Sequence, residues 1–154
     1  MSSIAELNWI AWELALAFVR KDSNGKIRAY SKRILQKILG TLSDKNYIEE
    51  IKDIAENYNP PDRDKEKVRE FVENKLLPEL KKMDAKAGKA LMKYILWNVK
   101  TLENVRGEKE EKKLRIMLCA EGIDEKKIEE FLEKFSNLKS EKGHGMYRKK
   151  NRRW

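Results

Sequence analysis

The sequence of 154 residues contains a single cysteine, Cys119, so no disulfide can form within the chain. A lone thiol suits a reducing compartment, and we therefore expect a cytoplasmic protein. No apolar run reaches the roughly 18 residues that suggest a membrane-spanning helix. The longest candidate, residues 4–19, is interrupted by Glu6, Asn8 and Glu13 and has no basic segment before its apolar part. We therefore expect neither a transmembrane helix nor a secretory signal peptide.

Side chains that commonly carry chemistry are also scarce. The only histidine, His144, lies between two glycines near the C-terminus, where a rigid pocket around an acid or base is not expected. Cys119 lies among the apolar residues Leu114, Ile116, Met117 and Leu118, which predicts a core cysteine on a helix rather than a nucleophile. P-loop, HExxH, paired CxxC and GxSxG motifs are absent. We expect no enzymatic activity, no cofactor, no metal and no small-molecule substrate.

A nuclease that binds metal through carboxylates alone is the enzymatic alternative. Asp62 and Asp64 could hold Mg²⁺, which prefers oxygen ligands. The same two residues follow Pro60-Pro61, however, and are typical of a turn that leads into a helix, where negative charge in the first turn is favourable. The sequence favours the second explanation.

The positive charge of the chain is concentrated. Charged residues make up 40% of the sequence, and the formal net charge is +9 at pH 7. Residues 20–40 and residues 139–154 each carry seven basic residues and one acidic residue, a net charge of +6 per segment. The rest of the chain therefore has a net charge of −3. Two local excesses indicate a polyanionic partner. The abundance of Lys, Glu and Ile is similar to that of thermophile proteins.

Apolar periodicity predicts an all-α fold, a helical bundle of about six or seven helices at residues 1–138 with a basic C-terminal tail at residues 139–154. No segment shows the sustained alternation of a strand. The predicted helices cover residues 4–19, 26–39, 44–57, 64–83, 84–105, 108–120 and 124–135. Asp22-Ser23-Asn24-Gly25 predicts a turn, and Pro78 a kink or a new helix. The first helix, which includes Trp9 and Trp12, is predicted either to pack in the core or to form a subunit interface.

The helix predicted at residues 26–39 is the first candidate nucleic-acid site. Its apolar residues follow the helical period, and Arg28, Lys32, Arg33 and Lys37 lie on or beside a second stripe. Carboxylates do not interleave with these cations as they do in the helix at residues 44–57. We predict that the four side chains contact phosphates, with a steep salt dependence because bound cations displace counterions.

The C-terminal tail is the second candidate. Tyr147 and Trp154 bracket its basic cluster, so rings that stack on bases accompany cations that follow phosphates. The cluster consists of Arg148, Lys149, Lys150, Arg152 and Arg153. A tail that only increases solubility is the alternative.

One segment resembles a known family. Residues 76–89, LLPELKKMDAKAGK, resemble a region of the small helical subunits of Csm-type (type III-A) CRISPR effector complexes. In that family a basic and an aliphatic residue precede a short alanine-rich turn of helix that ends in Ala-Gly-Arg. The matching residues are Lys82, Met83, Ala87, Gly88 and Lys89, with Lys89 in place of the arginine and Ala85 in place of an aromatic. Residues 26–35 resemble the early basic helix of the family.

The resemblance implies a non-enzymatic, RNA-binding structural subunit of an antiviral ribonucleoprotein complex. It implies copies of the chain that stack beside other CRISPR effector subunits and contact the backbones of guide RNA and target RNA. Base pairing would supply the specificity in such a complex. By position in the motif, the resemblance adds Lys82 and Lys89 to the expected phosphate contacts.

A free-standing basic DNA-binding protein is the remaining alternative. Residues 120–124 could form the turn of a helix-turn-helix motif. The helix that follows carries Glu125, Glu129, Glu130 and Glu133, which phosphates would repel. The sequence therefore favours the RNA-binding subunit.

Overall fold

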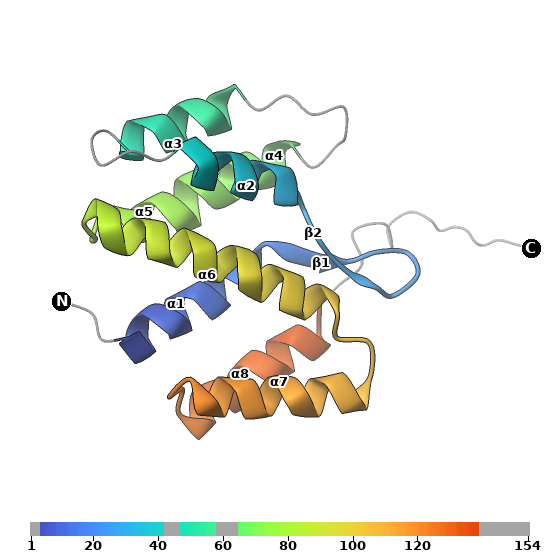
Figure 1. The fold of residues 1–154 in the computed structure, drawn as a ribbon. Helices are drawn as coiled ribbons and strands as arrows, with labels where there is room; N and C mark the ends of the chain where they lie inside the picture. The colour runs from blue at the N-terminus through green and yellow to red at the C-terminus, as the bar shows by residue number, and fades with distance from the viewer. Residues whose placement is uncertain (1–3, 42–46, 58–64, 139–154) are drawn as a thin grey trace, which may run out of the picture.

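The computed structural model describes residues 4–41, 47–57 and 65–138 (Figure 1). Its helices are α1 (Ile4–Ala17), α2 (Lys32–Thr41), α3 (Tyr47–Glu56), α4 (Lys65–Phe71), the π-helix η1 (Val72–Leu76), α5 (Leu77–Leu80), α6 (Ala85–Glu103), α7 (Glu108–Ala120) and α8 (Glu125–Ser136). Two short strands, β1 (Val19–Lys21) and β2 (Ile27–Ala29), pair as an antiparallel hairpin. Since α4, η1 and α5 are continuous, the described residues contain seven helices, and the predicted all-α bundle is confirmed.

The longest helix, α6, runs through the middle of the bundle, with α2 on one side and α7 on the other in the view of Figure 1. α1 packs along α6, and the hairpin and α2 also contact it. One face of α6 is fully buried and consists of Leu91, Met92, Ile95, Val99 and Leu102. These residues recur every three or four positions, so a single stripe of the helix supplies the central part of the core.

The first helix belongs to the core. Trp12 is fully buried, and its indole N–H donates to Glu121 Oε1 at 2.9 Å, which satisfies the one polar atom of the ring. Trp9 is half-buried, with its ring edge-on to that of Phe131 at a centroid distance of 6.1 Å. For Trp12, therefore, core packing is the correct choice between the two predicted roles.

The helix predicted at residues 26–39 begins too early, and the prediction that no strand is present is wrong. Residues 27–29 pair with β1, with Arg20 opposite Arg28, and the helix begins only at Lys32. The predicted turn at residues 22–25 is present and is closed by Asp22, whose carboxylate accepts the N–H groups of Asn24 and Lys26 at 2.8 and 3.0 Å. This Asx-type turn, with Gly25 at φ +79°, directs the chain back along β1.

Pro78 lies in the first turn of α5, and the helical path continues through it. The N–H of Leu77 donates to the carbonyl of Val72, five residues back, and α5 begins at this point. Proline has no N–H to donate, so it is tolerated in the first turn of a helix, where that N–H would have no partner within the helix. The wider π-helix η1 precedes this turn and leads into α5. Pro78 therefore lies just after the start of a new α-helical segment at Leu77, within one continuous helical path.

Cys119 is exposed, so the prediction of a core cysteine is wrong. On α7 the core contacts come from Leu114 and Leu118, which are four residues apart and buried. The residues between and after them turn away from the core, and Ile116 is 68% exposed. A run of apolar residues in the sequence therefore crosses both faces of this helix.

Tyr47 joins α3 to the α5–α6 turn. Its hydroxyl lies 2.8 Å from the carbonyl oxygen of Leu80 and 2.6 Å from that of Met83, and it can donate to either. The ring lies against Gly88, where an added Cβ would be 3.1 Å from Tyr47 Cε2. Gly88 thus permits the close approach of the Tyr47 ring to α6.

We predict that Tyr47→Phe lowers the free energy of unfolding by about 1–2 kcal/mol, because the carbonyls of Leu80 and Met83 lose a partly buried donor. Denaturant unfolding measures this change. Tyr94→Phe, at a half-buried tyrosine on α6, is the matched control and should change stability little. An equal loss in both variants would contradict the role assigned to the Tyr47 hydroxyl.

Candidate nucleic-acid interface

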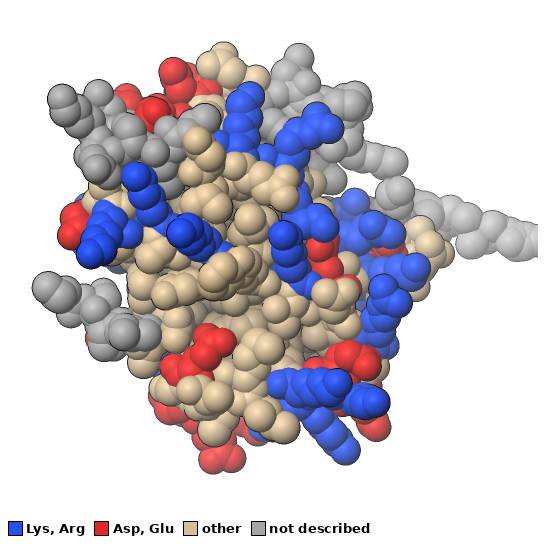
Figure 2. All heavy atoms as spheres, in the orientation of Figure 1, with Lys and Arg blue, Asp and Glu red and all other residues tan. Residues whose placement is uncertain are grey.

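Basic side chains are prominent over α2, the hairpin and α6 on the face seen in Figure 2. Uncharged surface lies between them, and both basic and acidic side chains lie toward α7. On α2 the apolar residues Ile34, Leu35 and Ile38 are buried, whereas Arg33 and Lys37 are exposed. The two-faced character predicted for this segment is therefore present from Lys32 onward.

Arg28 and Lys32, among the four predicted phosphate contacts, are each held by a carboxylate. Arg28 Nε lies 2.8 Å from Asp22 Oδ2, and Lys32 Nζ lies 3.0 Å from Glu103 Oε1. The hydrogen bond from Arg28 holds the pKa of Asp22 below its ordinary value, so this contact persists at neutral pH and weakens only as the pH falls through that lowered pKa. The charge excess counted in the sequence is thus partly neutralised within the fold.

Glu103 is the acid that connects segments far apart in the chain. Its side chain is 17% exposed, and its second oxygen accepts the N–H of Ala29 at 2.9 Å. One carboxylate therefore joins the end of α6 to both the hairpin and the start of α2. Lys32 is held by this junction, while Arg33, one residue further along, forms no ion pair with any described residue.

The residues added by the family motif lie near the start of α6. Lys82, in the turn between α5 and α6, is 70% exposed and lies 3.6 Å from Glu79. Lys89 is half-buried on α6. Lys89, which stands where the family has an arginine, therefore lies on the same helix as the hollow formed by α6 residues.

The outer face of α6 carries cations and rings that the sequence patterns did not assign to a site. An open hollow of about 930 Å³ runs along it, and its described lining consists of Asp84, Ala85, Lys86, Lys89, Ala90, Lys93, Tyr94 and Trp97. Trp97 is 59% exposed, which is unusual for the largest apolar side chain. Within the described part of the chain, Lys86 and Lys93 form no ion pair.

A helical period would have revealed this face. Once the buried stripe through Leu91, Ile95 and Leu102 is marked, residues 86, 93, 97 and 100 fall on the opposite side at steps of three, four or seven. Tyr94 and Trp97 are interleaved in the sequence with the apolar residues of the core stripe, so composition alone does not reveal that they lie on this face. The structure brings α2 and α6 side by side, and Lys and Arg lie over both helices on the face seen in Figure 2. We call this surface, Arg33, Lys37, Lys86, Lys89, Lys93, Tyr94, Trp97 and Lys100, the α2–α6 face.

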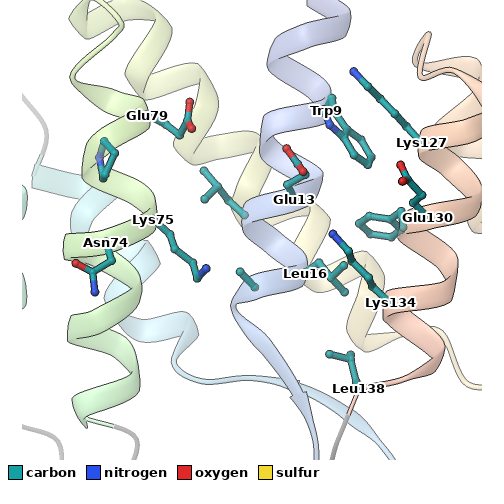
Figure 3. Close-up of a pocket in the computed structure, with 14 residues that line it drawn as sticks. Trp9, Glu13, Leu16, Asn74, Lys75, Glu79, Lys127, Glu130, Lys134 and Leu138 are labelled. Atoms are coloured by element: carbon teal, nitrogen blue, oxygen red, sulfur yellow. The ribbon is translucent and has the colours of Figure 1, made fainter.

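A second depression lies between α1, the η1–α5 segment and α8, with a volume of about 670 Å³ (Figure 3). Its charged lining is balanced and consists of Glu13, Glu79, Glu130, Lys75, Lys127 and Lys134. Burial raises the pKa of Glu13, an effect that the nearby Lys134 and Lys127 oppose. Equal numbers of carboxylates and ammonium groups give this groove no preference for a polyanion.

The α7–α8 pair does not resemble a basic DNA-reading element. Glu125, Glu129, Glu130 and Glu133 are all exposed on α8. Arg115 of α7 is held by Glu129 through two contacts of 2.6 and 3.1 Å. The acidic surface expected at this helix is therefore present, and the structure adds nothing in favour of the helix-turn-helix alternative.

Several predicted sites lie outside the described residues. These are the tail cluster Arg148, Lys149, Lys150, Arg152 and Arg153, the rings of Tyr147 and Trp154, His144, and the carboxylates Asp62 and Asp64. Within the described ranges, no three His, Cys, Asp or Glu side chains are grouped closely enough to hold a metal ion. Nor is any helix there both long and apolar enough to span a membrane.

Comparison with known proteins gives no further guide. No protein-family model, curated protein or solved structure matches the chain.

We predict that Glu103→Ala and Glu103→Gln differ in stability. The alanine variant leaves the N–H of Ala29 without its acceptor and should lose about 1–3 kcal/mol of unfolding free energy. The glutamine variant keeps a carbonyl oxygen for that N–H and loses only the partly exposed ion pair with Lys32, which is worth less than about 1 kcal/mol. Denaturant unfolding distinguishes them, and equal losses would show that the hydrogen bond to Ala29 does not stabilise the junction.

Proposed function

We propose that this protein binds RNA through the α2–α6 face and performs no chemistry on it. The observation that carries the proposal is the grouping of exposed cations from two helices around one uncharged strip (Figure 2). Arg33, Lys86, Lys93 and Lys100 form no ion pairs with the described residues, so no described carboxylate competes with phosphate for them.

The chemistry of the face supports contact with the backbone rather than with base edges. Its charged groups are mainly lysines, which act as mobile point charges and do not impose the planar, two-pronged geometry of arginine. Phosphates bound in this way release counterions whatever the base sequence. The protein would then position a strand whose sequence is read by something else.

We further propose a type III-A CRISPR effector complex as the setting of this activity, with the chain as a small structural subunit. The support is the resemblance of residues 76–89, together with the position of Lys89 on the α2–α6 face. In that setting the partners are guide RNA, target RNA, other effector subunits and further copies of the chain, and the location is cytoplasmic. Lys82 and the basic tail would provide additional contacts.

Absence of nuclease activity is part of this proposal. Purified protein incubated with single-stranded or duplex RNA and Mg²⁺ should leave both intact. Metal-dependent cleavage that disappears in the Asp62→Asn/Asp64→Asn variant would instead establish the carboxylate nuclease considered above.

We predict that the double reversal Arg33→Glu/Lys93→Glu weakens RNA binding and flattens its salt dependence. Removal of one ammonium or guanidinium group from a phosphate should lower the slope of log K against log salt concentration by about 0.7–0.9. Fluorescence anisotropy of a labelled RNA across a salt series measures both quantities. Circular dichroism checks that the helical content is unchanged.

The matched control for this prediction is Lys52→Glu/Lys126→Glu. It makes the same change in net charge with two exposed lysines on α3 and α8, the helices in which carboxylates are dense. Binding should fall much less in the control, because only long-range repulsion changes. If both double variants lose the same affinity, overall charge rather than the α2–α6 face determines binding.

A further inference from the structure

We infer that the hollow on α6 binds unpaired bases of a single strand, with one base stacked on Trp97 and the neighbouring phosphates held by lysines. This inference rests on the proposed RNA-binding function and adds the form of the nucleic acid. It follows from the exposure of one aromatic side chain and from the charges placed before and after it along the helix.

The position of Trp97 is not explained by packing. The core stripe of α6 lies on the opposite side of the helix, and the indole keeps 59% of its surface exposed. Leaving so large an apolar surface in water is unfavourable. A flat ring at a surface that is otherwise charged is the arrangement by which proteins stack on the face of a base.

Tyr94 supports this ring without covering it. The two ring centroids are 6.1 Å apart and the ring planes are inclined by 50°. The two rings therefore do not stack in parallel on each other, and the pair forms an angled wall of the hollow. A planar base can enter against the indole while the phenol limits its sideways movement.

The lysines are spaced along the helix on both sides of Trp97. A rise of 1.5 Å per residue places Lys93 about 6 Å before Trp97, Lys86 about 16 Å before it and Lys100 about 5 Å after it. All three lysines are exposed. A strand that lies along α6 can thus place phosphates near the ammonium groups while a base between them meets the ring.

A duplex cannot use the ring in this way. Paired bases are stacked on one another and present only their edges in the grooves, so their faces are inaccessible except at an end or a bulge. The lysines, in contrast, attract the phosphates of either form. The α2–α6 face should therefore bind both forms electrostatically and gain additional affinity only for unpaired bases.

The test uses the full-length chain with a labelled oligouridine, which has little structure, and an RNA duplex of equal phosphate content. Trp97→Ala should weaken oligouridine binding by about 5- to 100-fold, the range found when a stacking ring is removed. Its duplex affinity and its salt slope should stay within about twofold of the parent values, because all of the lysines that meet phosphates are retained. Trp97→Phe should recover most of the oligouridine affinity.

The control is Ile116→Ala, which removes a large side chain that is 68% exposed on α7 and outside the hollow. It should leave binding of both RNAs unchanged. The inference is overturned if Trp97→Ala binds oligouridine as tightly as the parent, or if it loses oligouridine and duplex affinity equally while its helicity is intact. Failure of the proposed function looks different, since the parent protein itself would then show no salt-dependent binding of either RNA.

Discussion

The division of α6 into two faces is the constraint on which the described structure depends. Leu91, Ile95 and Val99 are fully buried under α1, α2 and the hairpin, and burial of each such side chain contributes about 1.5–3 kcal/mol. The same helix must then present its remaining residues to water. Because those residues are lysines, a tyrosine and a tryptophan, the requirement for a core also produces a basic and aromatic outer surface.

Glu103 connects the end of α6 to the hairpin and to the start of α2. Its carboxylate is mostly buried and contacts the backbone N–H of Ala29 and the ammonium group of Lys32. Loss of these contacts would leave a buried charge without partners, which is unfavourable. The junction sets where the hairpin ends and α2 begins. It also holds Lys32 in an ion pair, so the centre of the proposed interface lies nearer to Arg33 and the outer face of α6.

Much of the fold could be read from local signals. Asp84 and Asp124 accept the N–H groups of Ala87 and Lys127 at 2.8 and 2.9 Å, and the helices begin where these caps predict. The hairpin was missed because three residues per strand are too few to show alternation, and because its pairing depends on Asp22 and on the contact with Glu103. Cys119 was assigned to the core, and the exposure of Trp97 was not predicted, because the apolar character of a residue does not specify on which side of its helix it lies.

The sequence by itself determined the helical class, most helix boundaries, the location of the charge excess and the two-faced pattern of α2, since each of these follows from neighbours a few residues apart. Tertiary structure alone decided which cations have carboxylate partners and which aromatic ring is exposed. The physical reason is that ion pairing and burial depend on distances between segments far apart in the chain: Glu103 reaches Lys32, and α1 covers one face of α6 and not the other.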